Sequence, residues 1–317
     1  MTAKDKLFTA LLGLFGLGCL WPQISPALAL AAGAVLALAL GNPFGEKISK
    51  ASRLLLALSV VGIGAGMDLH DVLKAGASGL GYTLAGIVFA LGLGALLGRA
   101  LKADRDTSLL VSVGTAICGG SAIAAIAPVI RAKPHAISVA LATVFLLNGV
   151  ALVVFPPVGH FFGLSQEQFG LWAALAVHDT SSVVGATLHY GQEALQTGTT
   201  VKLARALWIV PLAFFIGYAY ARKGEDAGGG KVKKPWFILG FIALAALVTW
   251  FPALQGAGEI VAAVAKRLMV LTLFLIGTNL TMDALKSVGP RPLVLGVVLW
   301  LCVAGLTLWA VMVEIVR

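Results

Sequence analysis

Apolar runs long enough to cross a bilayer follow one another along this chain, and that pattern constrains its fold more than any motif. Charged residues make up only 12% of the 317 residues, and mean hydropathy is +0.96. A soluble domain carries about a quarter charged residues, so a soluble protein is excluded. The runs are continuous rather than alternating, which excludes an outer-membrane β-barrel. We therefore expect an all-α polytopic membrane protein, with residues 1–317 forming a single domain.

A helix needs about 20 mainly apolar residues to cross the hydrocarbon core, and the sequence predicts about ten to eleven such helices. They are expected at 7–21, 25–40, 52–67, 78–98, 107–130, 136–156, 168–190, 200–221, 235–251, 257–280 and 291–315. If all of them cross, the excess of Lys and Arg in alternate loops places the N-terminus inside and the C-terminus outside. A broken segment that turned back would reverse everything after it, and the sequence leaves this open.

A weak internal sequence similarity, here called the echo, predicts an inverted repeat. Arg53-Leu-Leu-Leu and Asp71-Val-Leu-Lys74 resemble Arg267-Leu-Met-Val and Asp283-Ala-Leu-Lys286. The echo joins an odd span to an even one, so the two copies would run in opposite directions, as transporter repeats do. The halves would join around 157–167, and the glycine-rich loop 222–234 would be cytoplasmic. Chance similarity between leucine-rich helices is the alternative.

Polar and small residues interrupt the predicted span 107–130. Thr115, Cys118, Gly119, Gly120 and Ser121 gather in its middle. Two consecutive glycines weaken a helix and permit positive φ, and Ser121 could cap the half-helix that follows. Such a helix start suits an anion, which makes these residues a candidate substrate site. Close helix packing is the alternative, because Gly, Ser and Ala are common at helix interfaces in membranes.

A second interruption, in the predicted span 168–190, holds an ionisable pair. Its members are His178, Asp179, Thr180, Ser181 and Ser182. A carboxylate at mid-span costs at least ~2.5 kcal/mol, so it is usually paired or lies on an ion pathway. Oxygen ligands around Asp179 would suit sodium, whereas His178 could carry a proton instead. We interpret the segment as an ion-coupling site. A structural polar network between helices is the alternative.

Three further residues belong to the candidate site. Asn148 lies in an apolar span and could contact substrate or join helices. Lys202 and Arg205 share a helix face and could attract an anion, although snorkelling to the interface explains such residues more often. The cysteines lack metal-site spacing, and no P-loop, cofactor motif or nucleic-acid module is present, so no cofactor and no nucleic-acid partner are expected.

With these residues in view, the chain resembles the YeiH-type sulfate exporter family of conserved bacterial membrane proteins, within the cation/proton antiporter and anion transporter group. The resemblance covers essentially the whole chain and rests on four stretches: Gly114-Thr-Ala-Ile-Cys-Gly-Gly-Ser-Ala-Ile-Ala-Ala125, Ala127-Pro-Val-Ile130, Ala176-Val-His178 with Val183-Val-Gly-Ala186, and Val201-Lys-Leu-Ala-Arg205. The family pattern has a small residue and a Gln-like position where Asp179, Ser181 and Ser182 stand here. The family name therefore does not fix the transported species.

The resemblance implies inverted repeats, two discontinuous helices that meet near the membrane centre, and alternating access, as in antiporters and bile-acid symporters. We expect a secondary active transporter of the bacterial inner membrane rather than an enzyme. It would move a small anion such as sulfate, sulfite, a sulfonate or a carboxylate, coupled to sodium or protons, and a homodimer is left open. A passive channel is one alternative. An intramembrane hydrolase with Ser121 as nucleophile and His178 as base is another, although no GxSxG elbow is present.

Overall fold

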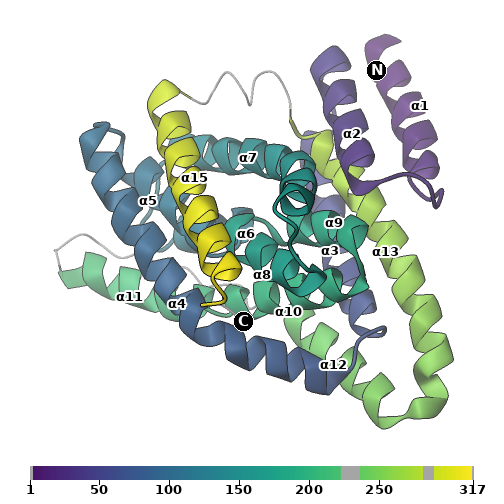
Figure 1. Ribbon diagram of the computed structural model, residues 1–317. Helices are drawn as coiled ribbons and strands as arrows, with labels where there is room; N and C mark the ends of the chain where they lie inside the picture. Colours follow the sequence, from purple (N-terminus) through teal and green to yellow (C-terminus); the bar gives the residue numbers. More distant parts are fainter. Residues whose placement is uncertain (1–2, 223–235, 281–288, 316–317) are drawn as a thin grey trace.

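The computed structural model describes residues 3–222, 236–280 and 289–315, and every regular element in that part of the chain is a helix (Figure 1). The first half contains α1 (Ala3–Gly18), α2 (Pro26–Leu40), α3 (Gly45–Gly64), α4 (Leu69–Ala100), α5 (Arg105–Ala116), α6 (Gly120–Ile126) and α7 (Pro134–Phe161). The second contains α8 (Gln166–Ala176), α9 (Thr180–Tyr190), α10 (Gln192–Ala206), α11 (Ile209–Arg222), α12 (Trp236–Trp250), the 3-10 turn η1 (Pro252–Leu254), α13 (Gln255–Gly277) and α15 (Pro290–Met312).

Several of these helices can cross a membrane by their length and composition. Five long apolar segments qualify among the described residues: Gly81–Ala100, His135–Phe161, Gln192–Tyr220, Pro252–Gly277 and Pro290–Met312. The shorter helices α2 and α12 are also apolar. The expectation of an all-α membrane protein with many spans is thus confirmed. The predicted loop 222–234 and the repeat partners Asp283 and Lys286 lie outside the described residues, apart from Arg222 at the end of α11.

Contacts between loops define two opposite faces of the bundle. The first is here called the N-face. α2 and α13 both end there, because Asn42, just after α2, donates from Nδ2 to the carbonyl of Thr278, just after α13, at 2.8 Å. The turn after α4 joins the same face, because Arg291 at the start of α15 donates to the Lys102 carbonyl at 3.3 Å. α1 also begins there, with the Phe8 ring 6.4 Å from that of Phe44.

The opposite side, here called the far face, carries the turn after α1 and the start of α10. Arg267 of α13 donates from Nη1 to the Trp21 carbonyl at 3.2 Å, and the neighbouring Lys266 donates to Gln192 Oε1 at 2.8 Å. These bonds place residues far apart in sequence at one level. Each helix can therefore be assigned a direction between the two faces.

Close packing joins α13 to both α2 and α3. A Cβ on Gly277 would lie 2.2 Å from the Leu30 carbonyl oxygen, and one on Gly33 would lie 2.1 Å from the Phe274 carbonyl oxygen. Only glycine permits backbones to approach so closely, which is the usual way helices associate in a bilayer. α13 runs from the bottom toward the top along the right-hand side of Figure 1.

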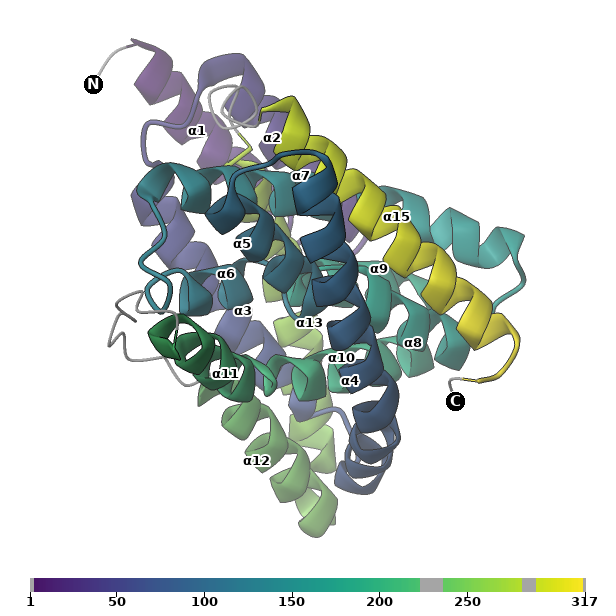
Figure 2. The same ribbon diagram turned by 90° about the vertical axis from the view of Figure 1, so that its left-hand side faces the viewer.

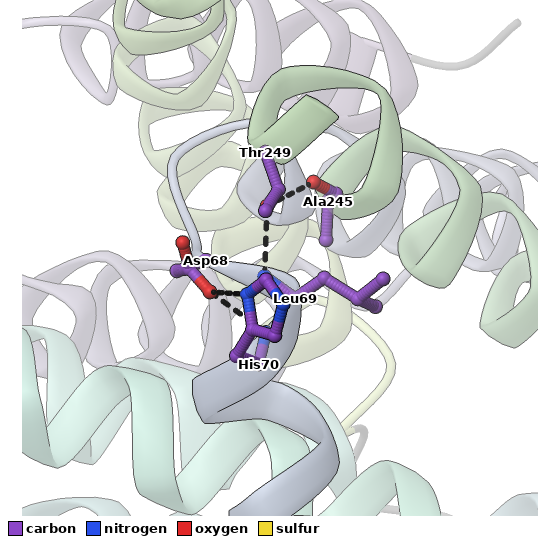
Figure 3. A network of polar contacts seen from close by, with 5 residues as sticks. All are labelled: Asp68, Leu69, His70, Ala245 and Thr249. Atoms are coloured by element: carbon purple, nitrogen blue, oxygen red, sulfur yellow. Dashed lines mark hydrogen bonds and ion pairs between the residues drawn. The ribbon is translucent and has the colours of Figure 1, made fainter. Parts of the chain in front are cut away.

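A polar network fixes the start of α4 against α12 (Figure 3). Asp68 is the N-cap of α4, and its Oδ1 accepts hydrogen bonds from the His70 backbone N at 2.7 Å and from its ring Nδ1 at 3.0 Å. Thr249 accepts from the Leu69 N–H at 2.9 Å while donating to the Ala245 carbonyl at 2.8 Å. Two N–H groups that a helix start leaves open are thereby satisfied.

α5 and α6 form a hairpin that enters from the N-face. Arg105, at the start of α5, lies over the Tyr220 ring at 5.0 Å from its centroid. Val129, just after α6, lies 3.2 Å from the Cβ position of Gly217. Gly217 and Tyr220 share one turn of α11, so both ends of the α5–α6 pair contact the same place. The predicted span 107–130 is broken where expected, at residues 117–119, but it turns back there.

α8 and α9 form a second hairpin, which enters from the far face. Tyr190, at the end of α9, donates to the Leu164 carbonyl just before α8 at 2.8 Å, and its ring stacks on Phe169 with centroids 3.7 Å apart. The predicted span 168–190 therefore turns back at residues 177–179. The segments 107–130 and 168–190, predicted as spans, are thus hairpins, a point that the sequence had left open. Figure 1 shows α6, α8 and α9 at the centre of the molecule, and Figure 2 shows the same part from the side.

Candidate functional site

The tips of the two hairpins meet in the interior. A Cβ on Gly119 would lie 3.5 Å from both the Asp179 Cβ and the His178 carbonyl carbon. Asn148 of α7 joins them, because its Oδ1 accepts a hydrogen bond from the Asp179 backbone N at 3.1 Å. Asn148, His178 and Asp179 are all buried. Residues from two separate breaks and a third helix thus form one polar site.

Asp179 is the N-cap of α9. Its Oδ2 accepts from the Ser181 backbone N at 3.1 Å and also from the Ser181 hydroxyl. A carboxylate at a helix start is favoured by the open N–H groups and by the helix dipole. The sequence pattern alone did not predict this capping role. Thr180 and Ser182 are buried beside it in the first turn of α9.

Lys202 and Arg205 of α10 reach the same place from the opposite side. Their side chains are 0% and 1% exposed, so neither reaches the membrane interface. Lys202 Nζ donates to the carbonyls of Ala174 at 3.2 Å and Val177 at 2.6 Å. These bonds overturn the expectation that snorkelling explains the two residues. The tertiary fold holds them in the interior because both have several acceptors there.

Arg205 binds both hairpins at once. Its Nε donates to the Ala116 carbonyl at 2.8 Å and its Nη2 to the Thr115 carbonyl at 3.3 Å, both at the end of α5. Its Nη1 donates to the Ala174 carbonyl at 3.3 Å and to the Leu175 carbonyl, both at the end of α8. A planar guanidinium with five donors can satisfy acceptors in two directions, which a lysine cannot.

These bonds account for nearly all the open carbonyls at the two broken helix ends. A helix leaves its last four carbonyls without intrahelical partners. In α5 the backbone N–H groups of Ile117 and Gly119 satisfy two of them, and Arg205 satisfies the other two. In α8 the Val177 N–H satisfies one, and Lys202 and Arg205 satisfy the next two. The two cations therefore act as C-caps for half-helices buried away from water.

Several buried polar atoms around this meeting point have no hydrogen-bond partner. They are Thr115 Oγ1, Asn148 Nδ2, both ring nitrogens of His178, and the hydroxyls of Thr199 and Thr200. An unpaired buried polar atom costs about 1–3 kcal/mol, so such a cluster needs an explanation. A polar solute or water bound at the tips would supply the missing partners.

The remaining predicted residues differ in their placement. Cys118 is buried at the first tip, within electrostatic range of Asp179 and Lys202. Gly120 faces α7, where its Cβ position lies 3.1 Å from the Phe145 ring. Ser121 is exposed, and the N-cap of α6 is Gly119, with no side-chain cap bond. The predicted capping role of Ser121 is therefore wrong, because the tip glycine occupies the N-cap position and Ser121 comes two residues later.

An aromatic group that the sequence did not single out lies beside the site. Phe155 of α7 stacks between Trp172 and Trp300, at 4.1 Å and 5.9 Å between ring centroids. The Trp300 ring is also 6.5 Å from that of His178. These rings cover one side of the second tip with apolar surface. No sequence signal distinguishes them from the other aromatic residues of the spans.

The charges at the tips do not balance. When Lys202 and Arg205 are both protonated, the tips hold two positive charges, and Asp179 is the one carboxylate within electrostatic range of Lys202 among the described residues. The partial charges of the helix ends roughly cancel, because two C-terminal ends (α5, α8) and two N-terminal ends (α6, α9) meet here. A net positive charge therefore remains in the interior. Such a charge is costly in a membrane protein unless something pairs with it.

A cavity of about 220 Å³ lies between α2, α7 and α9. Ser25, Pro26, Gly185 and His189 line it together with Pro156 and its neighbours in α7. It lies toward the far face from Asp179, along α9, and does not include the tip residues. Pro156 and Pro157 have no N–H, so the carbonyls of Leu152 and Val153, also in the lining, lose their usual helical donors. The cavity thus offers polar acceptors within an apolar wall.

The described part of the chain gives little support to a metal site or to a serine hydrolase site. It contains no group of three or more His, Cys, Asp and Glu side chains that could hold a metal ion. Neither ring nitrogen of His178 has a hydrogen-bond partner, so none of them reaches the Ser121 hydroxyl. A hydrolase with Ser121 and His178 as nucleophile and base requires that contact.

Comparison with known proteins identifies close relatives. The family model described as "Conserved hypothetical protein 698" matches residues 10–296. A UPF0324 membrane protein of Bdellovibrio bacteriovorus is 60% identical over 98% of this chain and 96% of its own length. UPF0324 membrane proteins of Bacteroides thetaiotaomicron and Vibrio parahaemolyticus are 46% and 44% identical, over 90% and 95% of this chain and 86% and 97% of their own lengths. No solved structure matches the chain.

Proposed function

This chain belongs to the family described as conserved hypothetical protein 698, and we propose that it is a secondary active transporter of a small anion. The observation that carries the proposal is the pair of buried cations, Lys202 and Arg205, at the point where the two hairpins meet. With Lys202 protonated and one carboxylate nearby, the site has an uncompensated positive charge. A bound anion would neutralise it.

The neighbouring polar atoms support a transported solute rather than a fixed internal ion pair. Asn148 Nδ2, Thr115 Oγ1 and the His178 ring all lack partners, and each can donate a hydrogen bond to an oxyanion. Sulfate, sulfite, sulfonates and carboxylates all present the oxygen acceptors that these donors fit. We include all of them in the proposed substrate class.

The hairpins also suit alternating access. One enters from each face, so each tip is covered on one side by its own half-helices and on the other by the opposite hairpin. Irregular backbone at this depth is tolerated where it lines a solute site. We propose that the two hairpins, each followed by a crossing helix, form part of an inverted repeat, whose join around 157–167 stays a prediction. The cavity beside α9 would be the solute's route from the far face.

Charge on the two faces supports an orientation with the N-face in the cytoplasm. Most cations whose side chains the structure describes lie toward that face: Lys4, Lys6, Lys47, Lys50, Arg99, Lys102, Arg105, Arg131, Lys133 and Arg291. Lys266 and Arg267 lie toward the far face. Because positive loops stay on the cytoplasmic side, the N-terminus would be cytoplasmic in a bacterial inner membrane.

The test is flux into liposomes containing the purified protein. Labelled sulfate, sulfite, a small sulfonate and a small carboxylate are supplied under a sodium gradient and, separately, a proton gradient. We expect at least one of them to accumulate above its own gradient. Asp179→Asn should abolish accumulation while leaving downhill exchange. Glu167→Gln, which also replaces a carboxylate by its amide but at an exposed residue on the far face, should keep both accumulation and exchange.

Two outcomes would contradict the proposal. Flux that never exceeds equilibrium under either gradient indicates a passive channel. Accumulation that survives in Asp179→Asn at the wild-type level removes Asp179 from the coupling mechanism.

A further inference from the structure

The acceptors at the hairpin tips are those that a coupling cation uses in other carriers. In transporters with broken helices, unwound carbonyls and half-helix C-terminal ends coordinate sodium. Here the corresponding carbonyls belong to Thr115, Ala116, Ala174, Leu175 and Val177. Each of them already accepts a hydrogen bond from Lys202 or Arg205.

The one carboxylate at the site is engaged as well. Oδ2 of Asp179 accepts two hydrogen bonds from Ser181, and Lys202 lies within electrostatic range. Sodium would therefore have to displace either a serine or an ammonium group. Displacing Ser181 frees no carbonyl. Displacing the ammonium would free the Ala174 and Val177 carbonyls, but only by expelling a cation that is already tethered there by the Lys202 side chain.

Resting on the proposed anion transport, we propose that Lys202 and Arg205 take the place of a sodium ion, so that this carrier works without sodium and moves protons with its anion. Arg205 holds its charge permanently, whereas the Lys202 ammonium can release a proton. With Lys202 protonated the tips carry one excess positive charge and bind a monovalent anion. With Lys202 neutral, Arg205 and Asp179 balance and the anion leaves.

The titratable groups within electrostatic range of Lys202 come from the two tips and from its own helix. They are Asp179 and His178 from the second tip, Cys118 from the first tip, and Arg205 from its own helix. The bond to Val177 at 2.6 Å holds Lys202 against the second hairpin in particular. Loss of its proton would therefore weaken one hairpin's attachment to α10 while Arg205 keeps both attached.

The first arm of the test measures sodium binding without relying on transport. Thermal unfolding of the purified protein is followed in sodium chloride and in choline chloride at equal concentration. We expect the same Tm for the wild type in both salts. Lys202→Met leaves the cation position empty, so sodium should raise its Tm by about 2 °C or more relative to choline. Lys266→Met, which removes a half-buried lysine of α13, should show no such difference.

The second arm measures coupling in sodium-free liposomes. An inward proton gradient should drive accumulation of the anion, with internal acidification reported by a pH dye. Lys202→Met should lose the pH-driven accumulation and the acidification together. A monovalent anion should move with one proton, so its flux should not respond to a membrane potential set with potassium and valinomycin.

The outcomes separate this proposal from the one on which it rests. If sodium raises the Tm of the wild type, or if accumulation requires sodium, Lys202 and Arg205 do not replace a sodium ion. This measurement uses the wild type, so it is valid even if Lys202→Met does not fold. Absence of any anion flux contradicts the transport function. The comparison of Tm in sodium and choline chloride still tests whether the cation site binds sodium. Sodium-free accumulation without acidification overturns proton coupling.

Discussion

At the scale of single residues, Arg205 shows how a charge can be stable deep inside a membrane protein. Its guanidinium exchanges water for four carbonyl acceptors at the ends of α5 and α8. The same bonds satisfy carbonyls that would each cost about 1–3 kcal/mol if left buried and unpaired. The cation and the broken helices thus stabilise one another, and neither arrangement is favourable alone.

Asp104 gives a testable case at the same scale, outside the membrane-spanning segments. It is the N-cap of α5, and its Oδ2 accepts from the Thr107 backbone N at 3.0 Å and from the Thr107 hydroxyl at 2.9 Å. The Thr107 backbone hydrogen bond lowers the pKa of the Asp104 carboxyl, and the Thr107 hydroxyl and the charge of Lys133 act in the same direction. The carboxylate is therefore favoured by the folded state.

We expect Asp104→Ala to lower the free energy of unfolding by about 0.5–1 kcal/mol near pH 7, since the residue is exposed and caps one helix. A lowered folded-state pKa means that the carboxylate's contribution is present above its unfolded pKa of about 4 and is lost as pH falls through the folded value. The difference in Tm between Asp104→Ala and the wild type should therefore shrink below about pH 4.

Asp104→Asn serves as the control, because an asparagine keeps the cap without titrating. Its Tm should stay near that of the wild type at pH 7. An Asp104→Ala deficit that is equally large at pH 3 and pH 7 would contradict the assignment of the pH effect to this carboxylate.

At the scale of elements, the two hairpins depend on backbone shape at their tips. Gly119 has φ +62°, in the left-handed region that favours glycine, and its Cβ position would lie 3.2 Å from Val144. The chain can turn there because a glycine carries no side chain. α7 then packs against the tip and places Asn148 beside Asp179.

We expect Gly119→Ala to destabilise the protein by about 1–2 kcal/mol through backbone strain and crowding, and to abolish anion flux because the tips are displaced. Gly92→Ala is the matched control. Gly92 lies in the interior of α4 with no atom within 4 Å of its Cβ position, so alanine should leave Tm unchanged or slightly raised. Equal effects of the two substitutions on Tm would contradict a special role for the tip.

At the scale of the whole molecule, the hairpins change which loops share a face. With both turning back, Arg131 and Lys133 join the N-face instead of the opposite side. The described cations are then concentrated on one face, as membrane topology favours.

Cysteine labelling tests that arrangement. Single cysteines are introduced at the exposed positions Glu167, Glu193 and Lys133, in a Cys302→Ser background because Cys19 and Cys118 are buried. Glu167→Cys and Glu193→Cys should react with an impermeant thiol reagent in intact cells. Lys133→Cys should react only after permeabilisation. Reaction of residues 167 and 193 from opposite sides would mean that α8 and α9 together cross the membrane.

Much of this protein could be predicted from the chain alone. Continuous apolar runs dictate helices because only a helix satisfies its backbone within a single segment in hydrocarbon. The glycines and the buried carboxylate mark where two helices break. The first break, at residues 117–119, lies inside the predicted polar segment, and the second, at 177–179, overlaps the start of the segment predicted at 178–182. The capping role of Lys202 and Arg205 could not be predicted in this way. A helix face with two cations has the same sequence pattern whether it contacts lipid headgroups or buried carbonyls.

The sequence by itself determined the helical class, the two breaks and the residues available for chemistry, because these follow from local composition and backbone preference. Only the tertiary structure decided that both breaks turn back, that their tips meet, and that Lys202 and Arg205 hold them. The physical reason is that local sequence specifies where a helix must end. Where the chain goes next depends on which distant groups satisfy the carbonyls left open there.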